Sequence, residues 1–152
     1  MRRFAKPIAG TLALTLCAVV VTGALAGNNP NRLRANMTGA KERPDPGDRN
    51  GSGTAFVRLN SRATRVCFFI THQRIVRPVA GHIHRGGPRT AGPIVVPLFE
   101  RASGAASPIR GCEGDVTGAL IRQIRNRPGG FYVNLHNGPF PAGAIRGQLR
   151  QR

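Results

Sequence analysis

The stretch GSGTAFVRLNSRATRVCFFITH, residues 51–72, decides the fold class of this protein. Within Thr54–Asn60 every second side chain is aliphatic, and this period of two is typical of a β-strand with one buried face. Arg65–His72 has the composition of a second strand, so the two strands and the turn between them predict a β-hairpin. Because the run VCFFI is apolar at every position, we expect the second strand to be buried on both faces, with Cys67 inside the core.

Short segments on both sides of the hairpin have the same strand-like patterns. Pro97 lies within one of them and is easiest to accommodate at the edge of a sheet or at a β-bulge. Residues 100–115 are rich in Gly, Ser and Ala and are expected to form a loop. The additional strands are expected at Leu33–Ala40, Val79–His84, Ile94–Phe99, Phe131–His136 and Ala144–Leu149.

One segment, Val116–Asn126, changes its period and predicts a helix. Leu120, Ile121 and Ile124 fall on one helical face, and Thr117 is placed to cap the N-terminus. Many short strands with a single late helix indicate an all-β fold, either an antiparallel β-sandwich or a Greek-key barrel with one short inserted helix.

Residues 1–26 have the layout of a secretory signal peptide. The first residues are cationic, an apolar run extends from Ile8 to Val21, and the small-residue motif ALA ends at Ala26. Cleavage there leaves a single β domain of 126 residues, 27–152. An uncleaved membrane anchor is the alternative, because the apolar region is only just long enough to span a bilayer. We expect a secreted or periplasmic protein with no membrane span after cleavage.

The domain expected after cleavage is strongly basic. It keeps 20 Lys and Arg against 6 acidic residues, a formal charge of +14, and all but one of these cations are arginine. Such an excess attracts polyanions. The arginines are spread along the chain and the Phe and Tyr residues are mostly at positions expected in the core, which argues against nucleic acid as a partner. Acidic glycans, lipopolysaccharide or cell-wall polymers remain candidates.

Two cysteines, Cys67 and Cys112, lie in the expected mature domain, while Cys17 would be removed with the signal peptide. An even number of cysteines in an oxidising compartment suggests a disulfide. Two buried free thiols are the alternative.

Four segments occur in a distinctive order: GSGTAFVRLN at 51–60, VCFFI at 66–70, AGHIHRGGPRTAGPIVVPLF at 80–99 and GFYVNLHNGPFPAGAIRGQL at 130–149. Together they resemble the CHRD (chordin) domain family, which occurs in animal chordin and in many secreted microbial proteins. The resemblance implies an extracytoplasmic all-β domain, and it places both cysteines where microbial members carry theirs. It does not imply growth-factor binding, because the cysteine-rich modules that accompany the domain in chordin have no counterpart here.

Three histidines are candidate metal ligands. His82 and His84 are one residue apart on an expected strand, so they point to the same face with about 7 Å between them. His136, at the end of another expected strand, could supply a third imidazole, and this ligand set suits copper or zinc. The alternative is that the histidines bond to backbone groups and fix the ends of strands.

The His-x-His pair also resembles, loosely, the strand that holds copper in copper-zinc superoxide dismutases. That dinuclear site uses six histidines and an aspartate, whereas residues 27–152 contain four histidines in all. Neither a nucleophile elbow nor a phosphate-binding loop is found. We therefore expect no enzymatic activity.

Arg146 is a candidate anion-binding residue, because a guanidinium can hold a carboxylate or similar anion with two hydrogen bonds. The alternative is an ion pair with Glu100 or Asp115. The first interpretation of function is a single-domain secreted or periplasmic protein that binds or scaffolds an unknown protein, glycan or envelope polyanion. The alternatives are a mononuclear copper or zinc protein and an arginine-rich binder of envelope polyanions.

Overall fold

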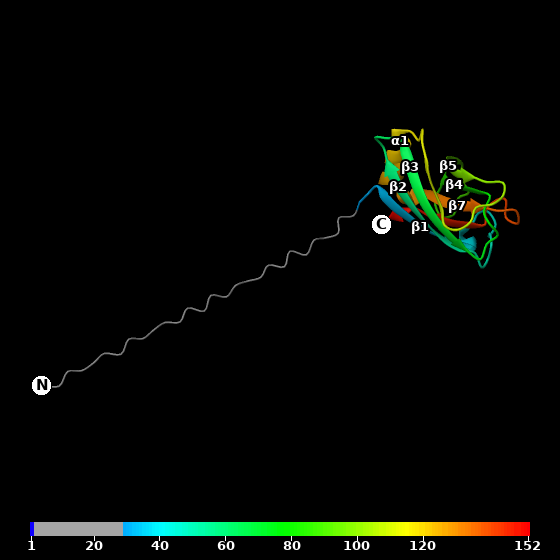
Figure 1. Ribbon diagram of the computed structural model, residues 1–152, viewed down its shortest axis with the longest axis horizontal. Coiled ribbons are helices and arrows are strands. Elements are labelled where there is room, and N and C mark those ends of the chain that lie inside the picture. The colour runs from blue at the N-terminus through cyan, green and yellow to red at the C-terminus, as the bar shows by residue number, and fades with distance from the viewer. Residues whose placement is uncertain (2–28) are drawn as a thin grey trace.

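The computed structural model of the protein describes Met1 and residues 29–152 (Figure 1). Residues 2–26 of the expected signal peptide, its cleavage site and Cys17 lie outside the described residues. Within the described part of the chain, no helix has the length and apolar character that a membrane crossing needs.

The fold is all-β, as predicted, and it is built around one antiparallel sheet. The strand order is β5-β4-β7-β8-β1-β2-β3-β6, with the short β9 also paired to β1. The elements are β1 (Arg32–Thr38), η1 (Gly39–Lys41), β2 (Ser52–Asn60), β3 (Arg65–Gln73), β4 (Ala80–Arg85), β5 (Ile94–Glu100), β6 (Ile109–Glu113), α1 (Gly118–Asn126), η2 (Pro128–Gly130), β7 (Phe131–His136), β8 (Ile145–Gln148) and β9 (Arg150–Gln151).

The sheet curves into a nearly closed barrel. Its two end strands, β5 and β6, contact each other across the open side, and the rings of Phe68 and Phe99 lie 6.4 Å apart between β3 and β5. Figure 1 shows β1, β2, β3 and α1 on one side of the domain and β4, β5 and β7 on the other. The predicted helix is confirmed, and the side chain of Thr117 caps it by accepting a hydrogen bond from the backbone N–H of Leu120.

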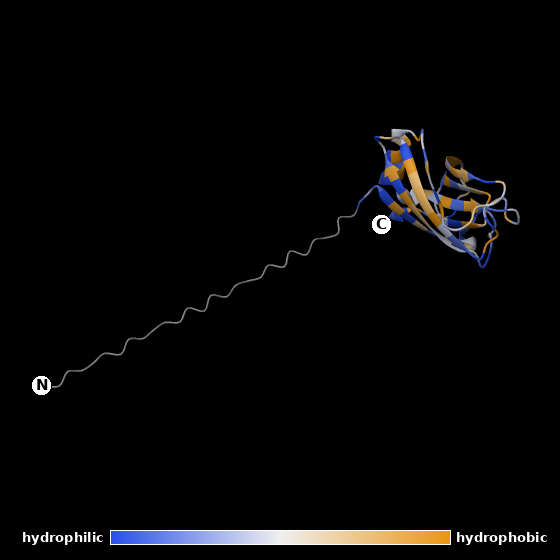
Figure 2. Ribbon diagram, in the orientation of Figure 1, coloured by the Kyte–Doolittle hydropathy of each residue, from blue (hydrophilic) through white to orange (hydrophobic). Residues whose placement is uncertain are grey.

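The interior of the barrel is filled by alternate residues of the strands, and the colours of Figure 2 alternate along the strands accordingly. The predicted alternation in β2 is confirmed, because its three aliphatic residues are all buried. In α1, Ile121 and Ile124 enter the same core. The core residues of the strands include Leu33, Ala35, Met37, Ala55, Val57, Leu59, Val66, Phe68, Ile70, Ile83, Val96, Leu98, Phe131, Val133, Leu135 and Ile145.

The expectation that β3 is buried on both faces is wrong. Val66, Phe68 and Ile70 enter the core, but Phe69 is 37% exposed and Cys67 is only half-buried. These two residues point outward, so the apolar run VCFFI combines one core face with one surface face. Neighbouring strands explain the apolar outward residues, because Cys67 is bonded to β6 and Phe69 packs beside another aromatic ring.

Residues 100–115 are not entirely a loop, because they contain strand β6. This strand pairs with β3, and Cys112 lies directly opposite Cys67. Only Ile109 of β6 is deeply buried, so the segment lacks the alternation that would reveal a strand. Pro97 lies on the edge strand β5, at a register irregularity opposite His82, as its position predicts.

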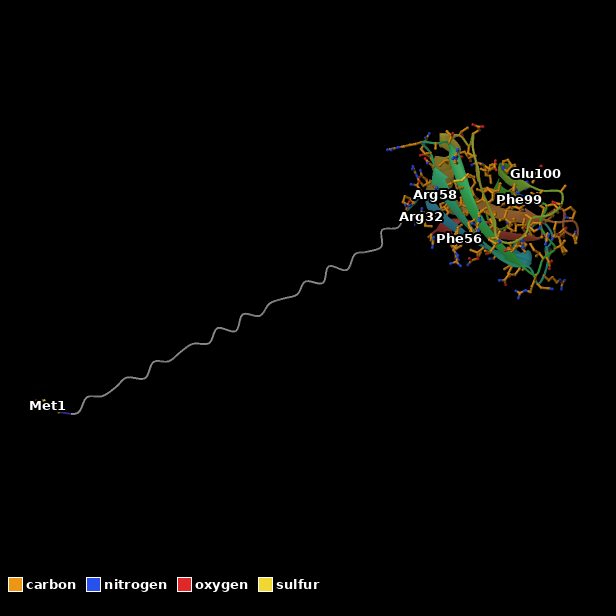
Figure 3. The ribbon with its side chains drawn as sticks, viewed as in Figure 1. Met1, Arg32, Phe56, Arg58, Phe99 and Glu100 are labelled. Atoms are coloured by element: carbon orange, nitrogen blue, oxygen red, sulfur yellow. A yellow bond between two sulfur atoms is a disulfide. The ribbon has the colours of Figure 1, made fainter. Side chains whose placement is uncertain are left out.

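The predicted disulfide between Cys67 and Cys112 is present and joins β3 to the end strand β6 (Figure 3). It encloses a sequence separation of 45 residues. The alternative of two free thiols is therefore wrong.

Replacing both cysteines by serine should lower the free energy of unfolding by up to about 4 kcal/mol, because the crosslink restricts the unfolded chain. Urea denaturation of the oxidised protein, the reduced protein and the Cys67→Ser/Cys112→Ser variant measures this difference. Equal stability of all three would contradict a structural role for the bond.

Candidate metal centre

A polar face covers the outside of the sheet at β4, β7 and β8. Strand register sets it, since Asn134 lies between His82 and Arg146, and Tyr132 lies opposite His84. The intervening residues of these strands enter the core, so the polar side chains must point away from it. The face consists of His82 and His84 on β4, Tyr132, Asn134 and His136 on β7, and Arg146 and Gln148 on β8.

Loops cover this outer face, so its side chains are largely buried. His82 and His84 are 7% and 8% exposed, and Arg146 is 1% exposed. The loop formed by residues 86–93 approaches closely because Gly92 has no side chain. A Cβ at Gly92 would lie 1.6 Å from the carbonyl oxygen of Arg85, so no other residue fits this approach.

The three predicted ligands come together at the centre of the polar face. One ring nitrogen of each of His82, His84 and His136 lies within 4.8 Å of those of the other two. The closest pair is Nδ1 of His82 and Nε2 of His136, which are 3.1 Å apart. The ring centroids of His82 and His84 are 5.6 Å apart, and those of His84 and His136 are 6.2 Å apart. Sequence spacing therefore identified a real cluster.

Backbone carbonyls fix the tautomers of two of these rings. Nδ1 of His84 is 2.8 Å from the carbonyl oxygen of Gly92, and Nδ1 of His136 is 2.9 Å from that of Pro141. A carbonyl oxygen can only accept, so both Nδ1 atoms carry the proton and donate. In the neutral ring the lone pair is then on Nε2 of each residue.

The two Nε2 atoms have different surroundings. Nε2 of His136 lies 3.1 Å from Nδ1 of His82, which can donate to it, and 3.1 Å from Oδ1 of Asn134, which cannot. Nε2 of His84 is buried and no described group meets hydrogen-bond geometry with it, although the side chain of Asn134 is near enough to act on the pKa of His84 in the opposite direction from burial. A buried acceptor without a partner is costly, so this nitrogen marks a position where a further group is expected to bind.

Burial keeps the three imidazoles uncharged. It is the main cause that lowers the pKa of each ring, and the pKa of His82 falls to about 4 through burial together with the neighbouring His136 and His84. At neutral pH the rings are therefore neutral, which is the form that binds metal ions.

The ring of His84 is held in place by a stack of three planar groups. Tyr132 stacks on His84 with centroids 4.8 Å apart and an interplanar angle of 8°. The guanidinium carbon of Arg146 in turn lies 3.4 Å from the centroid of Tyr132. Arg146 donates from Nη2 to the carbonyl oxygen of Gly87 and to the side chain of Gln148. Sequence reasoning did not find this stack.

Arg146 therefore has a different environment from the one expected. Its hydrogen-bond partners do not include Glu100 or Asp115, so the expected ion pair is not formed. Nη1 of Arg146 is buried without a partner among the described residues. Arg146, Lys41, Arg43 and Arg150 also line a cavity of about 310 Å³, and anion binding by Arg146 stays a prediction.

Two further ionisable residues are Glu42 and His72. Glu42, in the loop after β1, is 3% exposed, and burial raises the pKa of its carboxyl to about 7 although Arg146 acts in the opposite direction. Nothing in its loop sequence predicted this burial. The remaining histidine, His72, is on β3, where its Nε2 contacts the carbonyl oxygen of Ala105, so it does not belong to the cluster.

Fold and site together define an all-β domain with a disulfide and a loop-covered face that carries three converging histidines. Comparison with family models matches the CHRD domain over residues 33–149. The chain belongs to the CHRD domain family. No curated protein and no solved structure was found to match it. Domains of this family are extracellular, and the disulfide fits such a location.

The buried carboxyl of Glu42 should make stability depend on pH. Its pKa is about 7 in the folded protein against an ordinary value of 4.5. Below pH 4.5 both states are protonated, whereas between pH 4.5 and 7 only the unfolded state ionises, so rising pH favours unfolding by at most about 3 kcal/mol. Glu42→Gln should therefore gain stability relative to the parent protein across this range.

Urea denaturation of both metal-free proteins at several pH values measures this difference. A difference between the two that stays constant from pH 4.5 to 7 would show that Glu42 is not buried as a neutral acid.

Proposed function

We propose that this CHRD domain is a secreted or periplasmic protein that binds one copper or zinc ion through His82, His84 and His136, and that it acts by binding rather than by catalysis. The observation that carries the proposal is the buried Nε2 of His84, which has a lone pair and no partner among the described residues. A metal ion bound by the cluster would satisfy it.

A purely structural role for the histidines explains this arrangement less well. Histidines that only fix strand ends should have both ring nitrogens satisfied. His136 meets this condition, since Nδ1 donates to a carbonyl and Nε2 can accept from Nδ1 of His82. His84 does not, and leaving its Nε2 unpaired costs about 1–3 kcal/mol.

The hydrogen bonds to the histidines also support a metal site. Histidine ligands generally donate their other ring N–H to a carbonyl or carboxylate, which orients the ring. His84 and His136 both do so, through the carbonyls of Gly92 and Pro141. For His82 to use Nδ1, its proton must move to Nε2, which keeps the ring neutral.

The site needs a small closing movement around the ion. Zinc–nitrogen bonds are about 2.0–2.1 Å long, so the three ligand atoms should lie roughly 3–4 Å apart. The nitrogens of His82 and His136 already satisfy this condition, and all three ligand atoms lie within 4.8 Å of one another. A displacement of one ligand nitrogen by about 1 Å brings the separations into this range.

The ligand set limits the choice of metal. Three imidazoles leave at least one coordination position for water or another ligand. Nitrogen sites generally bind Cu²⁺ more tightly than Zn²⁺, so we expect Cu²⁺ to bind more tightly here as well.

Cu²⁺ or Zn²⁺ added to the metal-free protein should raise its melting temperature, because the ion binds the folded state. An ion concentration of 100 times Kd corresponds to about 2.7 kcal/mol of added stability. Differential scanning calorimetry measures the shift, and isothermal titration calorimetry should give one ion per chain. His84→Ala should abolish the shift.

His72→Ala is the matched control, because it removes a histidine that contacts the backbone outside the cluster. Its metal-induced shift should equal that of the parent protein. His82→Gln provides a second test if His84→Ala does not fold. An unchanged shift in folded variants of the cluster, or the absence of a shift in the parent protein, would overturn the proposal.

A further inference from the structure

A row of arginine and phenylalanine side chains lies on the outer surface of the half of the barrel formed by β1, β2, β3 and β6. Strand register aligns Arg34, Phe56, Phe69 and Arg110 in one row across these four strands. Since neighbouring strands are about 4.8 Å apart, the row spans roughly 14 Å from one arginine to the other. Two aromatic rings are thus placed between two cations on a rigid sheet.

The arginines lie against these aromatic rings. The guanidinium carbons of Arg34 and Arg152 are 5.8 Å and 4.9 Å from the centroid of Phe56, and that of Arg110 is 5.4 Å from the centroid of Phe69. The two rings are themselves 6.5 Å apart. Cation–π contact uses the flat face of a guanidinium, so the N–H groups at its edge remain available as donors.

Two further arginines extend the row. Arg32 lies opposite Arg58, two residues along β1 and β2 from the pair Arg34 and Phe56, and Figure 3 shows both near Phe56. A groove of about 320 Å³ is lined by residues that include Arg32, Arg58, Phe56, Phe69 and Arg152, and none of its lining residues is acidic. We call these residues, together with Arg34 and Arg110, the arginine–phenylalanine face.

No acidic residue lines the groove beside these cations. The buried Nε of Arg34 has no hydrogen-bond partner among the described residues. Placing five like charges on one face, three of them around the groove, is unfavourable unless solvent or a ligand compensates them. The face is therefore complementary to a ligand with several negative charges.

We propose that the arginine–phenylalanine face binds a linear anionic polysaccharide. Carboxylate or sulfate groups of the chain contact the arginine edges, where bidentate hydrogen bonding is favourable, and one sugar ring lies on the exposed ring of Phe69. An extracellular domain meets such glycans, and a single ring that is 37% exposed offers too little apolar surface for insertion into a membrane. The proposal does not depend on the metal site.

The test compares binding to heparin, which is sulfated, and to polygalacturonate, which carries only carboxylates, by surface plasmon resonance at several NaCl concentrations. Arg58→Gln/Arg110→Gln should weaken binding about tenfold or more at low salt. Arg122→Gln/Arg127→Gln is the matched control, because it removes the same charge from exposed positions at α1 and should weaken binding about twofold at most.

Phe69→Thr separates ring contact from charge. It keeps a residue suited to a strand and changes no charge, so we expect a loss of affinity of about threefold to tenfold with an unchanged salt dependence. Circular dichroism confirms that each variant is folded. If Phe69→Thr is not folded, Phe69→Leu takes its place. The glycan that binds with the higher affinity identifies the anionic group, sulfate or carboxylate, that is recognised.

Two results would overturn the proposal. If the double variant on the face and the control double variant weaken binding equally, attraction to the chain is general and the face has no special role. If a single-stranded oligonucleotide or vesicles of anionic phospholipid bind more tightly than both glycans, the face serves another class of partner.

Discussion

The register between β4 and β7 is the constraint on which the candidate metal centre depends. This pairing places His82 opposite Asn134 and His84 opposite Tyr132, with His136 two residues beyond Asn134 on the same face. The same register sends Ile83 and Val133 into the core. A slip of one residue would turn the apolar side chains outward and the histidines inward, so core packing holds the ligands on their face. The packing that stabilises the barrel therefore also fixes the positions of the imidazoles.

The two halves of the barrel present different chemistry because their outer faces are covered differently. Loops lie over the outside of β4, β7 and β8, where they exclude solvent and supply the carbonyls that orient His84 and His136. The outside of β2 and β3 is open, and there Phe69 remains exposed beside arginines. A buried face suits a small ion, whereas an open charged face suits an extended polymer. One curved sheet can thus carry two independent binding sites.

Local sequence patterns predicted much of this structure. The hairpin of β2 and β3, the helix with its Thr117 cap and the meeting of the three histidines all follow from periodicity and spacing, which are properties of neighbouring residues. Strand β6 could not be predicted from local patterns, because its pairing with β3 depends on a partner distant in the sequence. The outward direction of Phe69 could not be deduced either, since an apolar run is compatible with one or two buried faces. The burial of Glu42 likewise depends on loop packing and leaves no pattern in the chain.

The central claim is that three imidazoles of this domain bind one metal ion. X-ray absorption spectroscopy of the zinc-loaded protein tests it most directly, because it counts the imidazole ligands and measures their distances. The account predicts three imidazole nitrogens at about 2.0–2.1 Å, and the loss of this zinc–imidazole shell in His84→Ala. A shell of oxygen atoms with one imidazole or none, or a spectrum that is unchanged in His84→Ala, would contradict it.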